Sequence, residues 1–170
     1  MNFVTRLLMP LAAVALVAAP VHAQSYRIPA EGTPAIEVTK QAGFTEKYDD
    51  YGNLTFFAED KSGGLLFRTI EAGPTENMPD NAAIAELILG AAGAKPYSKR
   101  EATSFAGGPA EAFASTMSVG GGPLVEIVVV IRNLDARHLA VGVTMIPETT
   151  NAAGREVILA QFGQARIVNR

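Results

Sequence analysis

Two apolar runs divided by a short polar stretch set the strongest limit on how this chain can fold. Residues 123–146 read PLVEIVVVIRNLDARHLAVGVTMI, with the polar stretch RNLDAR in the middle. Each run is shorter than the ~20 residues that a membrane-spanning helix requires. Both runs are rich in β-branched residues, which are enriched in strands. We therefore expect a β-hairpin with strands over residues 125–131 and 139–146.

The predicted hairpin is apolar on both faces. In the first strand of the hairpin, Glu126 is the only polar residue. The second strand has Val141 and Val143 on one face and the small residues Ala140 and Gly142 on the other. A hairpin with one face in water would alternate apolar and polar residues. We therefore expect these strands in the middle of a buried antiparallel sheet, with helices on both faces and a close helix approach at the small residues.

Other strand patterns surround this hairpin. Alternating or aromatic runs predict strands at residues 36–40, 54–58, 65–70 and 112–119, and the turn EDKSGG joins the second of these to the third. The residues from Gln24 to Ala35 are polar and contain two prolines and a glycine, which is typical of an extended arm.

Two helices complete the pattern. The first opens at Asp80 or Asn81, whose side chains can cap free N–H groups, and ends at Gly93. Its apolar stripe follows helical spacing and consists of Ile84, Leu87, Ile88 and Ala91. The second begins near Thr150 or Asn151. Its apolar face consists of Ile158, Phe162 and Ala165. These elements predict an α+β fold: an α/β/α sandwich with a central, mainly antiparallel sheet of about 5–7 strands and helices on its faces.

The first 23 residues have the order of a secretory signal peptide. Arg6 supplies the positive charge, the 13 residues LLMPLAAVALVAA form the apolar segment, and small residues lead to Ala23. The apolar segment is short for a membrane anchor, so cleavage after Ala23 is favoured over an uncleaved anchor. The chain then divides into a cleaved signal peptide (1–23), a flexible N-terminal arm (24–35) and one α/β domain (36–170).

The amino-acid composition limits the compartments and the kinds of partner that are compatible with this protein. The chain has no cysteine, which excludes disulfides, a lipidated cysteine anchor and cysteine-based zinc sites. We therefore expect a protein without a membrane anchor, in the periplasm or secreted. The formal net charge of −3 and the lack of a strong Lys/Arg cluster argue against a nucleic-acid partner.

Residues 104–166 resemble the PsbP-like superfamily. SFAGGPAEAF resembles the glycine turn and strand of that family, LVEIVVVIRNLDARHLAVGVTMIP its central strands, and GREVILAQFGQARI its closing helix. The first half of the chain matches by the order of its elements. The superfamily includes the extrinsic photosystem subunit PsbP, a Ran-binding nuclear-import factor and many small exported bacterial proteins. The resemblance implies an α/β/α sandwich around an antiparallel sheet and a protein-binding role, and no catalytic residue set transfers.

His138 is the one histidine that would remain after signal-peptide removal, so histidine chemistry would have to use it. Asp135 lies close in sequence, and Ser104, Ser115 and Ser118 are candidate nucleophiles for a Ser/His/Asp arrangement. No G-x-S-x-G motif supports a hydrolase. We therefore expect His138 at a sheet end, with its ring satisfied by a neighbouring polar group.

The stretch YDDYGN groups Tyr48, Asp49, Asp50 and Tyr51 before a glycine. It lacks the spacing of a calcium-binding loop, so we expect a turn whose tyrosines and acids contact a partner. The glycine-rich pieces GGP (107–109) and GGGP (120–123) lack the phosphate-loop pattern. The sequence indicates no metal and no cofactor.

Three hypotheses about function remain open. The first is an exported, non-enzymatic protein that binds another envelope protein or component, through an apolar surface for which the region of Tyr48 and Tyr51 is one candidate. The second is a carrier of a small apolar ligand, held between sheet and helix where Ala140 and Gly142 leave room. The third is a hydrolase that uses His138. The sequence does not address the oligomeric state.

Overall fold

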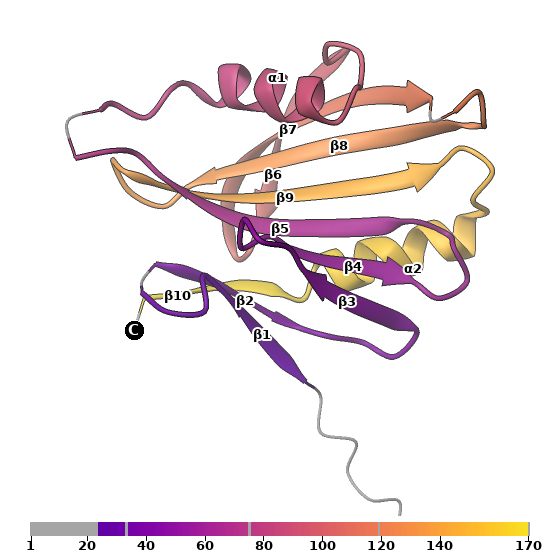
Figure 1. Ribbon diagram of the computed structural model, residues 1–170, viewed down its shortest axis with the longest axis horizontal. Helices are drawn as coiled ribbons and strands as arrows, with labels where there is room; N and C mark the ends of the chain where they lie inside the picture. Colours follow the sequence, from indigo (N-terminus) through magenta and orange to yellow (C-terminus); the bar gives the residue numbers. More distant parts are fainter. Residues whose placement is uncertain (1–23, 33, 75, 119, 170) are drawn as a thin grey trace, which may run out of the picture.

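The predicted hairpin lies at the centre of a seven-stranded antiparallel sheet. In the computed structural model, which describes residues 24–32, 34–74, 76–118 and 120–169, its strands are β8 (Leu124–Asn133) and β9 (His138–Pro147). The strand order is β3-β4-β5-β9-β8-β7-β6, so β9 is the middle strand (Figure 1). The predicted signal peptide at 1–23 lies outside the described residues.

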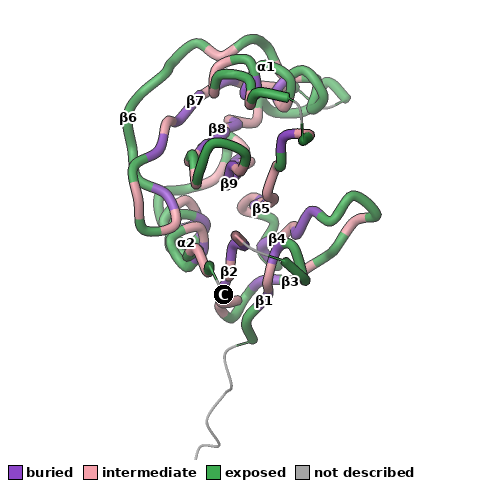
Figure 2. Tube along the Cα trace, turned by 90° about the vertical axis from the view of Figure 1, so that its left-hand side faces the viewer, coloured by how far each residue is buried: buried purple, intermediate pink, exposed green. Residues whose placement is uncertain are grey.

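Five further strands build this sheet outwards from the hairpin. Their bounds are β3 (Phe44–Tyr48), β4 (Leu54–Ala58), β5 (Gly64–Glu71), β6 (Lys99–Phe105) and β7 (Gly108–Ser118). The two edge strands, β3 and β6, were not predicted from the sequence. Almost all of β6 is exposed, because no element covers it (Figure 2). Such a strand has no apolar face, and apolar alternation is the pattern from which strands are predicted.

A second, three-stranded sheet joins the two ends of the described chain. It consists of β1 (Ser25–Ile28), β2 (Ala35–Thr39) and β10 (Ala165–Val168), with β2 in the middle and both pairings antiparallel. The prediction of a flexible arm at 24–35 is therefore corrected for β1, whose Tyr26 and Ile28 are buried in the core. Pairing with β2 satisfies the backbone of this segment.

Helices and the small sheet lie on the two faces of the large sheet. Helix α1 (Asn81–Ala91) packs on β7 and β8, and helix α2 (Ala152–Phe162) lies against β9 and β5 on the other face, beside the small sheet (Figure 1). Apolar clusters fill both interfaces. The predicted α+β sandwich with a central antiparallel sheet and helices on its faces is confirmed, and the three-stranded sheet is an addition to it.

Gly142 lets α2 approach the sheet closely, as predicted. A Cβ atom at this position would lie 2.5 Å from Cε2 of Phe162 and 2.9 Å from Cζ of Phe105. The rings of Phe67, Phe105 and Phe162 stack on one another, with centroids 5.0–6.2 Å apart. The space above Ala140 and Gly142 is therefore filled by aromatic rings. The prediction of a ligand cavity at this place is wrong.

The ends of the helices follow the predicted capping residues in most respects. Asp80 caps α1 by accepting a hydrogen bond from the N–H of Ala83, and Asn151 caps α2 by accepting one from the N–H of Gly154. The second helix ends at Phe162, with Gly163 as its C-cap. Ala165 therefore belongs to β10, not to the helical face assigned to it from the sequence.

The buried face of α1 is rotated relative to the prediction. Ile84, Ala85 and Leu89 are buried, whereas Leu87 is 71% exposed and Ala91 is also exposed. The apolar surface of α1 is thus wider than the part that the sheet covers. Within the described residues, no helix is long and apolar enough to cross a membrane.

Candidate functional site

His138 lies at the start of β9, where its ring is held by acidic neighbours. Its Nδ1 lies 2.8 Å from both carboxylate oxygens of Asp135, and its Nε2 lies 3.7 Å from Oε1 of Glu71. Hydrogen bonds from the backbone N–H of Arg137 and from His138 hold the pKa of Asp135 below its usual range. Because Asp135 also accepts from the N–H of His138, the cluster closes the turn between β8 and β9.

The three candidate serines do not join this cluster. The hydroxyls of Ser115 and Ser118 donate to the backbone oxygens of Lys95 and Gly122, at 2.6 and 3.3 Å. Ser115 aligns through β8 with Met145, seven residues along β9 from His138 and therefore about 23 Å away. Ser104 lies on β6, three strand spacings or about 14 Å from β9. The Ser/His/Asp arrangement therefore has no support in the geometry.

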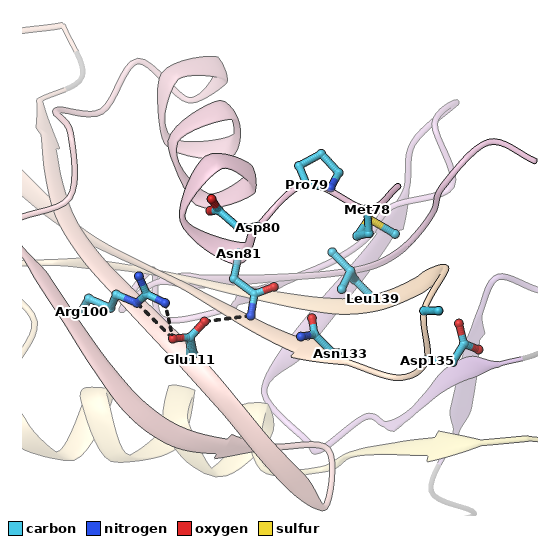
Figure 3. A pocket seen from close by; sticks show the side chains of 10 residues that line it. Met78, Pro79, Asp80, Asn81, Arg100, Glu111, Asn133, Asp135 and Leu139 are labelled. Carbon is cyan, nitrogen blue, oxygen red and sulfur yellow. Dashed lines mark hydrogen bonds and ion pairs between the residues drawn. The ribbon is translucent and has the colours of Figure 1, made fainter. Parts of the chain in front are cut away.

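A polar pocket of about 420 Å³ lies at the N-terminal end of α1 (Figure 3). At its centre, Oε1 of Glu111 accepts hydrogen bonds from Nη2 and Nε of Arg100, at 2.6 and 3.0 Å, and Oε2 accepts one from Nδ2 of Asn81 at 2.8 Å. Arg100 and, to a lesser extent, Asn81 lower the pKa of Glu111. These groups satisfy one another and tie α1 to β6 and β7. Their arrangement explains the anchoring of α1 to the sheet.

The predicted partner-binding turn carries exposed tyrosines. Tyr51 is 87% exposed, and Tyr48 is 46% exposed, with its ring 6.2 Å from that of Tyr26. Asp49 shapes the turn by accepting hydrogen bonds from the N–H groups of Tyr51 and Asn53 and from the side chain of Asn53. Asp50 is exposed. No cluster of acids and histidines suited to a metal ion occurs in the part of the chain that the structure describes.

An apolar groove of about 530 Å³ opens between α1 and the strands β5 and β9, and we call it the α1 groove. It exists because α1 packs on β7 and β8 and leaves this half of the sheet face uncovered. The groove is lined by Asn53, Leu66, Arg68, Ile70, Met78, Pro79, Ile84, Leu87, Ile88, Ala91, Ala92, Val143 and Met145. The uncovered apolar side of α1 thus faces an uncovered apolar part of the sheet.

The apolar surface continues beyond the α1 groove. A second hollow of about 370 Å³ shares Met145 with it and is also lined by Phe57, Met117 and Val125. Phe57 is 46% exposed. Together the two hollows form one apolar track along the face of the sheet that carries α1.

Two polar side chains interrupt the apolar lining of the α1 groove. The Nε atom of Arg68 and the Oδ1 atom of Asn53 are both buried without a hydrogen-bond partner. Arg68 was not among the residues predicted from the sequence, although one cation within the apolar strand LLFRTI was a visible signal. Asn53 closes the YDDYGN turn, so the predicted partner-binding turn ends at the wall of this groove.

This architecture is the PsbP-like fold, which confirms the family resemblance at the level of the fold. The solution structure of cyanobacterial PsbP (CyanoP) from Synechocystis sp. PCC 6803 is similar over 95% of this chain and 99% of that chain, with a TM-score of 0.59 and 11% sequence identity. A crystal structure from Bacteroides thetaiotaomicron VPI-5482 matches 79% of this chain, with a TM-score of 0.52 and 12% identity. This chain spans 45% of the length of that protein. No family model and no curated protein sequence matches this chain.

Proposed function

We propose that this protein is an exported, non-enzymatic protein that binds a segment of another envelope protein in the α1 groove. The observation that carries the proposal is the uncovered apolar track between α1 and strands β5 and β9. A partner that covers apolar surface stabilises the complex by about 25 cal/mol for each Å² that is removed from water. Large contiguous apolar patches on soluble proteins often mark interaction sites.

The polar clusters support a binding role over a catalytic one. Around His138, the acidic groups hold the ring and close a turn, and in the polar pocket Glu111 is fully engaged by Arg100 and Asn81. A nucleophilic mechanism requires a nucleophile within hydrogen-bond reach of its base. None of the serines proposed from the sequence meets this condition with His138.

Photocrosslinking at Leu87 tests the groove as the binding surface. A benzoylphenylalanine at position 87, on the exposed lip of the groove, should give a discrete adduct with an envelope protein in the exporting host. The same group at Leu159, which is 54% exposed on α2, serves as the matched control and should give none. Equal adduct patterns at the two positions, or no adduct at either, would contradict the proposal.

The volume of the α1 groove also favours a second candidate, a carrier of a small apolar ligand. Its 530 Å³ falls within the range of about 300–1,000 Å³ that is usual for ligand pockets. Mass spectrometry of organic extracts from protein purified without detergent separates the two functions. One stoichiometric apolar compound, depleted in the Leu87→Glu variant, would establish the carrier.

Export is tested by the N-terminus of the mature protein. The signal-peptide pattern predicts that protein recovered from the periplasm or the medium begins at Gln24. Edman sequencing or intact-mass measurement determines this directly, with a Leu11→Arg variant as the control that should block processing. Recovery of protein that still begins at Met1 would show that the leader is not cleaved.

A further inference from the structure

Arg68 places a positive charge at the wall of the α1 groove, where, after the hydrogen bonds from Asn53, it helps to lower the pKa of the neighbouring Asp49 without forming an ion pair with it. None of the ion pairs among the described residues involves Arg68. Its Nε is buried and donates no hydrogen bond. The side chain as a whole is half-buried, but a buried N–H group that has lost its water costs free energy unless an acceptor replaces that water. The Nε–H group of Arg68 is therefore an unused donor, carried on a cation, for an anionic acceptor in the groove.

Asn53 adds an unused acceptor beside this cation. The pairing of Leu54 with Phe67 places Asn53 opposite Arg68 on neighbouring strand positions, so both side chains face the groove. The Nδ2 atom of Asn53 donates to Oδ2 of Asp49, which orients the amide and leaves Oδ1 without a donor. On its other side, Arg68 pairs with the apolar residue Val141 of β9. One cationic donor and one neutral acceptor thus lie side by side at the apolar wall of the groove, with the carboxylate of Asp49 bound to the Nδ2 side of Asn53.

We infer that the α1 groove binds the free C-terminal end of a partner protein whose last residues are apolar; this inference rests on the proposed function. The terminal carboxylate accepts hydrogen bonds from the guanidinium of Arg68, which supplies charge complementarity. The backbone N–H of the same terminal residue donates to Oδ1 of Asn53. The apolar side chains of the last residues lie along the groove between Leu87 and Met145. Capture of a C-terminal carboxylate is one of the recurring modes of peptide recognition.

Other apolar occupants fit this pair of groups less well. A fatty acid presents a carboxylate to Arg68 but has no N–H for Asn53, so a buried acceptor would stay unpaired at a cost. An internal extended segment can supply an N–H but, at its backbone, no negative charge. The backbone N–H groups of an amphipathic helix are used within the helix beyond its first turn. A C-terminal residue supplies both the anion and the donor.

The test uses a pool of short peptides with a fluorescent label at the N-terminus and apolar residues at the C-terminus. Each peptide is made with a free carboxylate, with a C-terminal carboxamide, and with the last amide nitrogen methylated. We expect the wild-type protein to bind free-acid peptides, and each modified form to bind about tenfold or more weakly in fluorescence anisotropy, because each modification removes one buried hydrogen bond or charge contact. Arg68→Met should bind the acid and the carboxamide equally.

The outcomes separate this inference from the function on which it rests. Equal affinities for acid and carboxamide in the wild type, or no binding by any free-acid peptide, overturn C-terminal recognition. If the photocrosslinker at position 87 still gives an adduct in the host when C-terminal recognition fails, the groove is a protein-binding site of another specificity. Palmitate that displaces the peptides and binds more tightly would assign the site to a lipid and overturn the inference. Leu159→Glu, far from the groove, should bind like the wild type, and thermal melts should show that Arg68→Met is folded.

Discussion

Val129→Asp is expected to lower the free energy of unfolding by about 3–5 kcal/mol, the usual cost of a buried charge without a partner. Val129 is completely buried on β8, between Phe113 of β7 and Val143 of β9, and belongs to the apolar cluster beneath α1. Domains have a total stability of about 5–15 kcal/mol, so the loss is a large share of it. Urea unfolding followed by circular dichroism measures the change. Val157→Asp provides the matched control, because this valine is 44% exposed on α2.

The control should stay within about 0.5 kcal/mol of the wild type, as surface substitutions generally do. The comparison tests whether the central hairpin is covered on the α1 side. A similar small effect for both substitutions would mean that β8 is open to solvent, and the proposed architecture would then be wrong.

Gly142→Ala should destabilise the protein by about 2–3 kcal/mol, because the added methyl group overpacks the core. The new Cβ would lie 2.5 Å from the ring of Phe162, and stacking against Phe67 and Phe105 restrains that ring from moving away. Gly90→Ala is the matched control, since Gly90 lies within α1 and a Cβ atom added there would have nothing within 4 Å. This second substitution should stabilise the protein by up to about 1 kcal/mol through helix propensity.

A double-mutant cycle identifies the contact responsible. In a Phe162→Ala background, Gly142→Ala should cost at least about 1 kcal/mol less than in the wild type, because the ring that opposes the methyl group is gone. Additive effects of the two substitutions would show that Gly142 is required for some reason other than the approach of α2.

The central hairpin and the caps of the helices could be predicted because their causes are local. Two-faced apolar strands and the capping side chains of Asp80 and Asn151 are visible within a few residues of sequence. The end of α2 could not be predicted in the same way, because Ala165 continues the apolar spacing of the helix while its backbone pairs with Val38 of β2. That pairing joins residues that are far apart in sequence, and no local pattern encodes it.

The candidate site depends on how elements that are distant in sequence pack together. For this reason most of it could not be predicted from the sequence. Helical spacing identifies Leu87 as apolar but does not show that α1 packs on β7 and β8 with Leu87 turned away from them. Similarly, the sequence shows Arg68 within an apolar strand. Its lack of an ion pair among the described residues follows from its neighbours across the sheet, which are the amide of Asn53 just before β4 and the apolar Val141 of β9. The turn YDDYGN, which was predicted to bind a partner, lies next to the groove because its last residue, Asn53, lines the groove.

The small sheet has a consequence for the order in which the chain can finish folding. Its middle strand, β2, lies near the start of the described chain, and its partner β10 is the last strand, so that Arg166 meets Glu37 across 129 positions of sequence. Contacts that close such long loops form late, because the entropy of the intervening chain must be lost first. Until β10 has been made, Ile36 and Val38 lack the strand that pairs with them on one side in the finished domain. A domain with this topology cannot complete its fold before β10 has been made, which suits the proposed export of an unfolded chain through a secretion channel.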